Sequence, residues 1–385
     1  MRTEDAYSPH KAVRHLDVVQ AVRGGRPARP AHVQIILSDA CNQACNFCAY
    51  RDPSYTSSTL FYEVDAINVK RGLRRDTAHP ERNYNPSRMI PWPKVQEILD
   101  DCAAMGVSGV QFTGGGEPTV HPRWMDAIRY AHSRGLATSL VTNGVNVDRD
   151  GGADVVATMA WLRFSVDAGD AATYTATRNC PDSHWDRVWA NVAETAQAAR
   201  RHRQAYGHGA VVGVGYVVTP DNWRGIHDAV WLAREAGADN IRISARFSAD
   251  DERLFADCHE AAAVHARAAE SLQTEAFRVY NRFGEKLDDL RQKAPDYPRC
   301  GYQHFTTYIG ADLNLYRCCV YAYHPTGLYG SIKERRFRDA WMDEGRARGM
   351  ADFDTAKCER CQFNGINRFL NYALRADDPA HSAFV

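Results

Sequence analysis

The sequence SDACNQACNFCAY, residues 38–50, directly follows the apolar run AHVQIILS, residues 31–38. This run has the composition of a buried β-strand, so the cysteines are expected in the loop at its carboxyl end. Cys41, Cys45 and Cys48 have the spacing CxxxCxxC. Three thiolates from one loop can ligate three irons of a cubane and leave the fourth iron open, whereas a structural zinc site closes with four protein ligands. The loop predicts an open iron–sulfur site, with an incomplete zinc knuckle or fortuitous thiols as alternatives.

A second loop, rich in glycine, supports this interpretation. QFTGGGEP, residues 111–118, ends the second predicted strand. Its glycines would let the backbone approach a ligand closely, and Glu117 offers a carboxylate that can accept from an ammonium group. The loop lacks the GK[ST] of a P-loop and the GxGxxG of a dinucleotide fingerprint. A plain glycine turn is the alternative, but two such loops at adjacent strand ends favour a binding site.

The order of the predicted elements indicates the fold. Strand-like and helix-like segments alternate in six repeats over residues 31–246, with helices expected near 92–105, 122–134, 184–204 and 222–236. This rhythm predicts an α/β fold whose parallel sheet curls into a partial, TIM-like (β/α)6 barrel with function at the strand carboxyl ends. Residues 51–91 interrupt the first repeat, and we interpret this long insertion as a lid.

The rest of the chain divides into four parts. Residues 1–30 are expected to form an N-terminal tail or short cap, and residues 247–299 a helical linker with helices at about 250–272 and 276–292. Residues 300–367 contain five cysteines and lack the β/α rhythm, which predicts a small second domain. Residues 368–385 are expected to be a C-terminal tail.

Composition excludes several classes of partner. Lys plus Arg and Asp plus Glu both total 47, so no net charge draws the chain to nucleic acid or to an anionic membrane. The charged N-terminus and the lack of a long apolar run predict neither a secretory signal nor a membrane span, hence a cytoplasmic protein. In that reducing compartment the clustered cysteines indicate metal ligation rather than disulfides.

With these two loops, the chain resembles the radical S-adenosylmethionine (SAM) superfamily, whose marks are CxxxCxxC after strand one and Gly-Gly-Glu after strand two. The resemblance covers about residues 31–246. It implies a [4Fe-4S] cluster on Cys41, Cys45 and Cys48, with SAM chelating the open iron through its amino and carboxylate groups. Reduction of the cluster by an external donor such as flavodoxin or ferredoxin then releases a 5'-deoxyadenosyl radical.

The resemblance also implies a set of SAM-binding residues. Glu117 and the glycines before it would hold the methionyl amine, and Phe47 would pack near the adenine. Asn143 in VTNG and Ser165 in RFSVD match positions that often line the pocket, although both sequences are also ordinary turns. Weaker matches are Asn222 and Arg246. The full expected set is Phe47, Gly114, Gly115, Gly116, Glu117, Asn143, Ser165, Asn222 and Arg246.

The C-terminal cysteines form a second group. Four thiolates would fill an entire cubane, and the region resembles the twitch domain, the shortened relative of the SPASM domain. This resemblance implies one auxiliary [4Fe-4S] cluster, because too few cysteines follow for the two clusters of a full SPASM domain. A four-thiolate zinc site is the alternative. Cys319 could replace its neighbour as a ligand or have no role. The expected ligands are Cys300, Cys318, Cys358 and Cys361.

Electron counting favours one reaction class. A second cluster can accept an electron from a substrate radical, which favours dehydrogenation, whereas epimerisation needs a hydrogen donor. Cys180, in the loop after strand four, is the candidate donor, with a half-buried structural thiol as the alternative. His121, His184 and His304 are only pocket candidates, because no HxxxH or HxH pair is present.

The substrate is the least determined part of the prediction. Twitch relatives act on small polar molecules such as sugars and aminocyclitols, which favours a small-molecule substrate. The runner-up is maturation of a ribosomal peptide, which could join a strand edge formed by SYTSSTLFYEV, residues 54–64. A metal-binding module without catalysis is a third class, and the intact Gly-Gly-Glu element argues against it.

Overall fold

A computed structural model describes residues 8–51, 60–61, 85–248 and 251–375 of the chain. Its frame is one sheet of ten strands in the order β10-β9-β8-β1-β2-β3-β4-β5-β6-β7. The first six strands pair in parallel, each with the next along the chain, which confirms the predicted α/β fold with a curled parallel sheet. Their bounds are β1 His32–Ile36, β2 Gly109–Thr113, β3 Ala137–Thr142, β4 Trp161–Ser165, β5 Val211–Val218 and β6 Asn240–Ala245.

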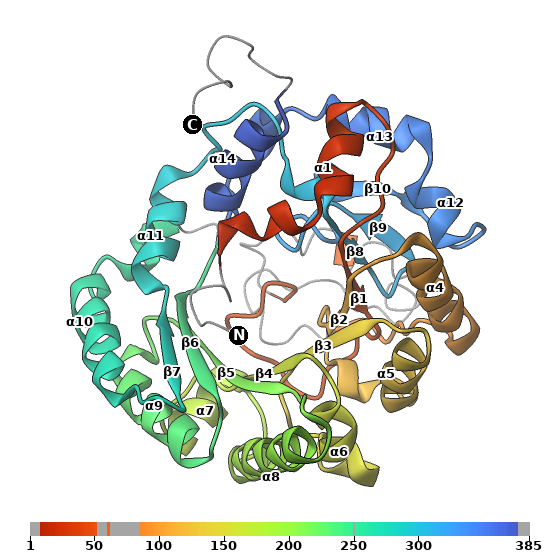
Figure 1. The fold of residues 1–385 in the computed structure, drawn as a ribbon. Coiled ribbons are helices and arrows are strands. Elements are labelled where there is room, and N and C mark those ends of the chain that lie inside the picture. The colour runs from red at the N-terminus through yellow and green to blue at the C-terminus, as the bar shows by residue number, and fades with distance from the viewer. Residues whose placement is uncertain (1–7, 52–59, 62–84, 249–250, 376–385) are drawn as a thin grey trace.

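The connecting helices lie on the outside of the curved sheet (Figure 1). Pro93 and the left-handed Gly106 mark the ends of the first of them, as proline and glycine commonly do. The four helices predicted between the strands are present with shifts of a few residues. The helices of this part are α4 Trp92–Met105, α5 Trp124–Ser133, α6 Gly152–Ala157, α7 Ala171–Arg178, α8 Ser183–Tyr206 and α9 Ile226–Glu235.

The expected helix over 276–292 is wrong in its first residues. Helix α10 spans His259–Ala269 and α11 spans Phe283–Gln292, but Arg278–Asn281 between them form strand β7. This strand pairs in parallel with β6, with Arg278 beside Asn240. The sequence RVYN suits a strand, and the open edge of β6 supplies the backbone partners that a helix would not use.

The cysteine-rich region continues the sheet of the barrel at its opposite edge. Strand β8, Thr306–Ile309, runs parallel to β1, with Thr306 beside His32. Strands β9, Asn314–Tyr316, and β10, Leu328–Ser331, then add in antiparallel order. The region ends with helices α12 Phe337–Trp341, α13 Glu344–Ala351 and α14 Asn364–Ala373, the last of which crosses the boundary expected at residue 367.

The N-terminal segment docks on this region rather than standing apart. A 3₁₀ helix, Pro9–Arg14, and helix α1, Leu16–Arg23, precede the first strand and lie beside α14 (Figure 1). A small apolar cluster joins the two ends of the chain through Ala12, Val18, Ala31, Phe305 and Leu370. In the described part of the chain, no helix is long and apolar enough to cross a membrane.

The predicted lid is described only at its ends. Residues 52–59 and 62–84, including most of SYTSSTLFYEV, lie outside the described residues. Phe61 is fully buried, with its ring 5.3 Å from that of Tyr50 and 5.1 Å from that of Tyr323. The start of the insertion therefore packs against the C-terminal region.

Candidate active site at the carboxyl ends of the strands

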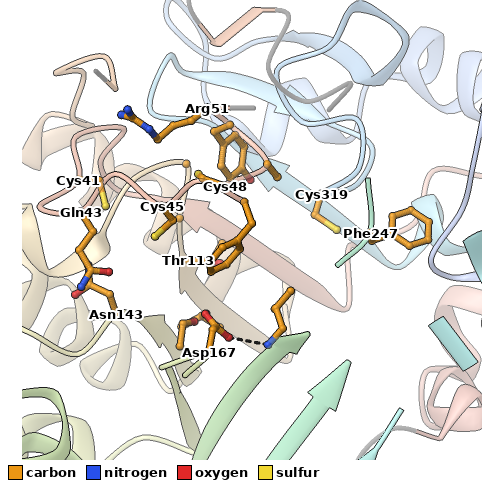
Figure 2. A pocket seen from close by; sticks show the side chains of 18 of the residues that line it. Cys41, Gln43, Cys45, Cys48, Arg51, Thr113, Asn143, Asp167, Phe247 and Cys319 are labelled. Carbon is orange, nitrogen blue, oxygen red and sulfur yellow. Dashed lines mark hydrogen bonds between the residues drawn. The ribbon is translucent and has the colours of Figure 1, made fainter. Parts of the chain in front are cut away.

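A cavity of about 400 Å³ opens at the carboxyl ends of the barrel strands. The loops after β1, β2, β3 and β4 contribute to its wall, together with the end of β6 and residues of the C-terminal region. Figure 2 shows Cys41, Cys45 and Cys48 on one side of it and Cys319 and Phe247 on another. The predicted residues that line it are Cys41, Cys45, Phe47, Cys48, Gly114, Gly115, Gly116, Glu117, Asn143 and Ser165.

The cysteine loop is held by the end of helix α7. Backbone amides of Ala44 and Asn46 donate to the carbonyls of Arg178 and Thr177 at 3.0 and 2.9 Å. The buried Arg178 guanidinium donates to the Gln43 side chain at 2.7 Å and to Cys45 Sγ at 3.7 Å. It also forms an ion pair with Asp167, which Figure 2 labels near the cysteine loop. These contacts fix the loop from outside the cysteine motif.

Arg178 also acts on the chemistry of the nearest thiol. Burial raises the pKa of Cys45 to about 12, and the positive charge of Arg178 is the largest opposing influence. Burial likewise raises the pKa of Cys41, with the neighbouring Cys45 and Glu117 adding to the effect. Because metal ligation needs thiolates, a bound cation would have to displace these protons, and Arg178 favours their loss at Cys45.

The glycines of QFTGGGEP bring two loops into contact. The amides of Gly116 and Glu117 donate to the carbonyls of Ser38 and Ala40 at 3.0 and 2.9 Å. A Cβ atom at Gly116 would overlap the carbonyl oxygens of Asp39 and Ala40. The sequence predicted close approach to a ligand at this loop, and the structure shows close approach to the backbone of the cysteine loop.

Glu117 joins the ends of β2 and β3. Its Oε1 accepts from the amide and hydroxyl of Thr119 at 3.0 and 2.7 Å and from the Thr142 hydroxyl at 2.6 Å. Its Oε2 accepts from the Asn143 amide at 2.7 Å. Burial raises the pKa of Glu117, and these four hydrogen bonds oppose that rise. Since an ionised carboxylate oxygen can accept more than one donor, Oε2 retains capacity for a ligand.

Asn143 bridges the same loops. Its side-chain amide donates to Asn42 Oδ1 at 2.6 Å, and its own Oδ1 accepts from the Val145 amide at 3.1 Å. The sequence VTNG was consistent with a pocket residue or with a turn. In the structure the side chain serves the turn and also lines the cavity.

Of the residues expected to bind SAM or to donate hydrogen, three do not line the cavity. Asn222 is buried and braces its own loop, accepting from the Thr219 amide at 2.7 Å and donating to the Asp167 carbonyl at 2.8 Å. Arg246 also lies outside the wall. Cys180 packs against the core, and burial raises the pKa of its thiol. The position of Cys180 therefore gives no support to a role as hydrogen donor.

The three histidines have different environments. His121 is buried, with Nε2 3.0 Å from the Ile90 carbonyl oxygen, so it holds the loop before α4. His184 lies in the first turn of α8, outside the cavity. His304 lines a different cavity, at the amino ends of strands β1 and β8.

Several residues of the cavity wall were missed from the sequence. Tyr50 and Arg51 follow the third cysteine, Asp167 follows strand β4, and Arg178 is the last residue of α7. A strand pattern could have indicated Arg242 and Ser244, because both alternate with buried isoleucines near the end of β6. Cys319, Arg360 and Gln362 come from the C-terminal region. No local pattern connects these three to the barrel, and only the tertiary structure places them there.

Asp39 is a further residue that the sequence did not single out. Its carboxylate pairs with Arg88 Nε at 2.7 Å and accepts from the Tyr323 hydroxyl at 2.5 Å. Burial raises the pKa of Asp39 to about 7, against the influence of Arg88. This buried group ties the start of the cysteine loop both to the end of the insertion and to the C-terminal region.

The structure separates Cys318 from Cys319. Cys318 and Cys358 are buried in one apolar cluster with Tyr321 and Phe353, and Cys300 packs against it. Burial raises the pKa of Cys300 to about 12, and the nearby Cys361 thiol contributes to this rise. Cys319 instead accepts from Gln362 Nε2 at 2.6 Å and faces the main cavity.

The spacing of these thiols bears on the kind of metal group. Among the residues that the structure describes, no three His, Cys, Asp or Glu side chains converge closely enough to hold a single metal ion. In a cubane each thiolate binds a different iron, so its ligands need not meet at one atom. The expected ligands of the second group are neighbours in this sense, as are the three cysteines of the first loop.

The fold and the two loops agree with the comparison to known families. Residues 35–230, half of the chain, match the Radical SAM superfamily, and the chain belongs to it. It is therefore a radical SAM enzyme that uses a [4Fe-4S] cluster and SAM. The CxxxCxxC loop and the Gly-Gly-Glu loop, on which the sequence-based prediction of this superfamily depended, both line the main cavity.

Two curated relatives match parts of the chain. One is the S-adenosylmethionine-dependent nucleotide dehydratase of Flammeovirga pacifica, 26% identical over 161 residues, 41% of this chain and 46% of that protein. Another is the tungsten-containing aldehyde ferredoxin oxidoreductase cofactor-modifying protein of Pyrococcus furiosus, 30% identical over 158 residues, 38% of this chain and 41% of that protein. The match thus spans less than half the length of either relative.

Solved structures share the fold over most of the chain. Streptococcus suis SuiB bound to S-adenosylmethionine superposes with a TM-score of 0.60 at 15% identity, covering 92% of this chain and 75% of that one. The anSMEcpe structure with bound AdoMet gives a TM-score of 0.52 at 14% identity, covering 88% of each chain. At such low identity these likenesses concern the fold alone.

Proposed function

We propose that this enzyme cleaves SAM at the main cavity and abstracts a hydrogen atom from a carbon of a substrate held in the same cavity. The observation that carries the proposal is that Cys41, Cys45 and Cys48 line one cavity with the Gly-Gly-Glu loop. When bound on these thiolates, the reduced [4Fe-4S] cluster supplies the electron that splits SAM into methionine and a 5'-deoxyadenosyl radical.

The residues of the chain have separate tasks in this proposal. Glu117 Oε2 is the acceptor for the methionyl ammonium group, because its other oxygen already accepts three hydrogen bonds. Ser165 and Asn143 offer polar atoms on the same wall, and Phe47 offers an apolar face to the adenine. Arg178 stabilises the thiolate of Cys45 and holds the loop in place.

The second group of cysteines is proposed to hold an auxiliary [4Fe-4S] cluster. What supports this is the shared position of Cys300, Cys318, Cys358 and Cys361. Burial raises the pKa of Cys318, and the thiols of Cys319 and of the other three raise it further. Cys319 and Gln362, which belong to the same region, line the main cavity, so the second group lies next to the substrate. The distinguishing measurement against zinc is metal analysis of anaerobically reconstituted protein.

The proposed reaction is the oxidation of a small polar molecule such as a sugar or aminocyclitol. Abstraction of one hydrogen atom leaves a carbon radical, and loss of one electron and one proton then gives a product two hydrogens poorer. The auxiliary cluster is the proposed electron acceptor, and an external reductant such as flavodoxin or ferredoxin resupplies the first cluster. One SAM is consumed in each turnover.

A second candidate is a reaction that leaves the oxidation state of the substrate unchanged, in which the substrate radical takes a hydrogen atom from a thiol. One electron from the external reductant and one proton from solvent then restore that thiol. Cys319 favours this reaction, because this thiol faces the cavity, whereas the donor expected from the sequence, Cys180, does not. Burial raises the pKa of the Cys319 thiol to about 11, so the thiol would keep its S–H at neutral pH. Maturation of a peptide remains the runner-up for the substrate class.

The test of the first step is SAM cleavage without substrate. Dithionite-reduced enzyme should slowly form 5'-deoxyadenosine, and replacing Cys41, Cys45 and Cys48 by alanine should abolish it and remove roughly half of about eight bound irons, four for each cubane. Cys102→Ala is the matched control, since this buried thiol lies in α4, away from the cavity. A triple variant that keeps its full iron load would refute the assignment.

The type of reaction is tested by measuring the mass and the deuterium content of the product formed from a substrate identified by screening. Oxidation predicts a product two hydrogens lighter, and Cys358→Ala with Cys361→Ala should abolish it while uncoupled SAM cleavage survives. A product of unchanged mass that gains one solvent deuterium, and that is lost in Cys319→Ala, would replace oxidation by the reaction that leaves the oxidation state of the substrate unchanged. A crosslink within a peptide would establish the runner-up.

A further inference from the structure

A second cavity, of about 530 Å³, lies at the opposite end of the strands. Ala28 and His304 line it, and they precede β1 and β8, which run parallel with His32 beside Thr306. The cavity therefore sits at the amino ends of these strands, whereas the SAM cavity sits at the carboxyl ends. None of the residues that line one cavity lines the other.

Its wall is strongly basic. Four arginines line it, from the N-terminal segment, the start of the cysteine-rich region and helix α13: Arg26, Arg299, Arg346 and Arg348. Glu344 is the one carboxylate among the described lining residues, and it pairs with Arg348 at 3.5 Å. For the other three guanidinium groups, no carboxylate of the described residues lies within ion-pair distance.

Nearby carboxylates are engaged elsewhere. Asp343 caps helix α13 by accepting from the Arg346 amide at 2.9 Å, and it also lies 3.8 Å from Arg335. Asp354 accepts from the Ala356 amide at 2.9 Å. Asp343 also acts on the side chain of Arg346, whose pKa it raises, so the positive charge of the wall is reduced at this residue.

The arginine deepest in the wall is held in position. The half-buried Arg346 stacks on Trp341, with the guanidinium carbon 3.9 Å from the ring centre, and its Nε donates to the Trp341 carbonyl. Trp341 is fully buried and donates from Nε1 to the Ala28 carbonyl at 2.8 Å. Arg346 Nη1 donates to Met350 Sδ, so the fold fixes Nε and Nη1 and leaves Nη2 for an anion.

The neighbouring titratable groups respond to this charge. Burial lowers the pKa of His304 to about 4, and Arg346, Arg317 and Arg299 lower it further. Burial also lowers the pKa of Arg346 to about 10. Both shifts have the direction expected where positive charge is buried, and Tyr329 and Asp343 oppose the shift of Arg346.

We propose that this cavity binds a small organic anion that carries phosphate or carboxylate groups, at a site separate from the SAM cavity. Arginine forks pair with both kinds of group through two parallel hydrogen bonds. The volume suits a small organic molecule rather than a single inorganic ion, since ligand pockets are typically about 300–1,000 Å³. The ligand would contact the N-terminal segment and helix α13 together, and so would stabilise the docking of the N-terminal segment.

Isothermal titration calorimetry with pyrophosphate and with citrate tests the proposal on the full chain. Each is expected to bind, more weakly as KCl is raised, because charge pairs are screened by salt. Arg346→Gln should weaken binding about ten- to a hundredfold, the usual effect of losing a hydrogen bond to a charged group. The exposed Arg299→Gln should weaken it less and tests the site without altering buried contacts.

Controls separate this site from the catalytic one. Arg267→Gln, an exposed arginine on helix α10, should leave anion binding unchanged. SAM cleavage should proceed at the wild-type rate in the Arg299 and Arg346 variants, because neither residue lines the SAM cavity. The proposal is overturned if neither anion binds the wild-type protein at low salt. It is also overturned if both anions bind the Arg299→Gln and Arg346→Gln proteins as tightly as they bind the wild type.

Discussion

Cys318 and Cys319 are adjacent, and the structure predicts opposite results for their replacement by alanine. Cys318 is buried beside Cys358 and Cys300, whereas Cys319 faces the SAM cavity. If the second group holds a cubane, Cys318→Ala removes one of its four ligands, and Cys319→Ala removes none. Reconstituted Cys319→Ala should therefore carry about eight irons, and Cys318→Ala about four.

The assay is iron and sulfide analysis after anaerobic reconstitution, together with electron paramagnetic resonance of the reduced protein. The two variants are matched controls for each other, since each removes one sulfur atom from neighbouring positions. Both should still cleave SAM, because neither residue belongs to the first cysteine loop. Loss of iron in Cys319→Ala with full iron in Cys318→Ala would refute the assignment of the ligand.

Three further predictions concern the SAM loop and the second cavity. Glu117→Ala should weaken SAM binding about ten- to a hundredfold through loss of a hydrogen bond to an ammonium group; an unchanged dissociation constant would place that contact elsewhere. Gly116→Ala should disrupt the cysteine loop and lower iron loading, because its Cβ would overlap backbone oxygens. The control is Gly284→Ala in α11, where the space around the glycine is open. This variant should stabilise the protein by about 0.5–1 kcal/mol in urea titrations. The pKa of His304 is lowered from 6.5 to about 4 by burial and nearby arginines, so the unfolded chain binds a proton that the folded chain does not. Stability should fall as the pH drops from about 6.5 toward 4, and a slope that His304→Gln leaves unchanged would contradict this.

Local sequence was sufficient where a motif and its element are contiguous. The strand over residues 31–38, the cysteine loop behind it and the glycine loop after the second strand all follow from short-range patterns. Parallel strands place their carboxyl ends at one edge of a sheet, so these loops had to meet there. For this reason the sequence could predict that the two loops line one cavity, and it placed the helices between the strands to within a few positions.

Long-range contacts decided the rest. The linker contributes strand β7 because the edge of β6 was open, and the cysteine-rich region extends the barrel sheet because the edge of β1 was open. Neither pairing leaves a local mark in the sequence. The same holds for the N-terminal segment, whose apolar residues pack against Phe305 and Leu370 nearly three hundred residues or more further along the chain.

The sequence by itself determined the class of fold, the superfamily and the first cluster loop, because each depends on residues close together in the chain. Only the tertiary structure decided that Cys319, and not Cys180, faces the cavity, and that Cys318 turns toward the other cysteines. It also brought together four arginines around the second cavity, from segments at both ends of the chain. Side-chain direction and the meeting of distant segments depend on how the whole core packs, and local patterns do not encode that packing.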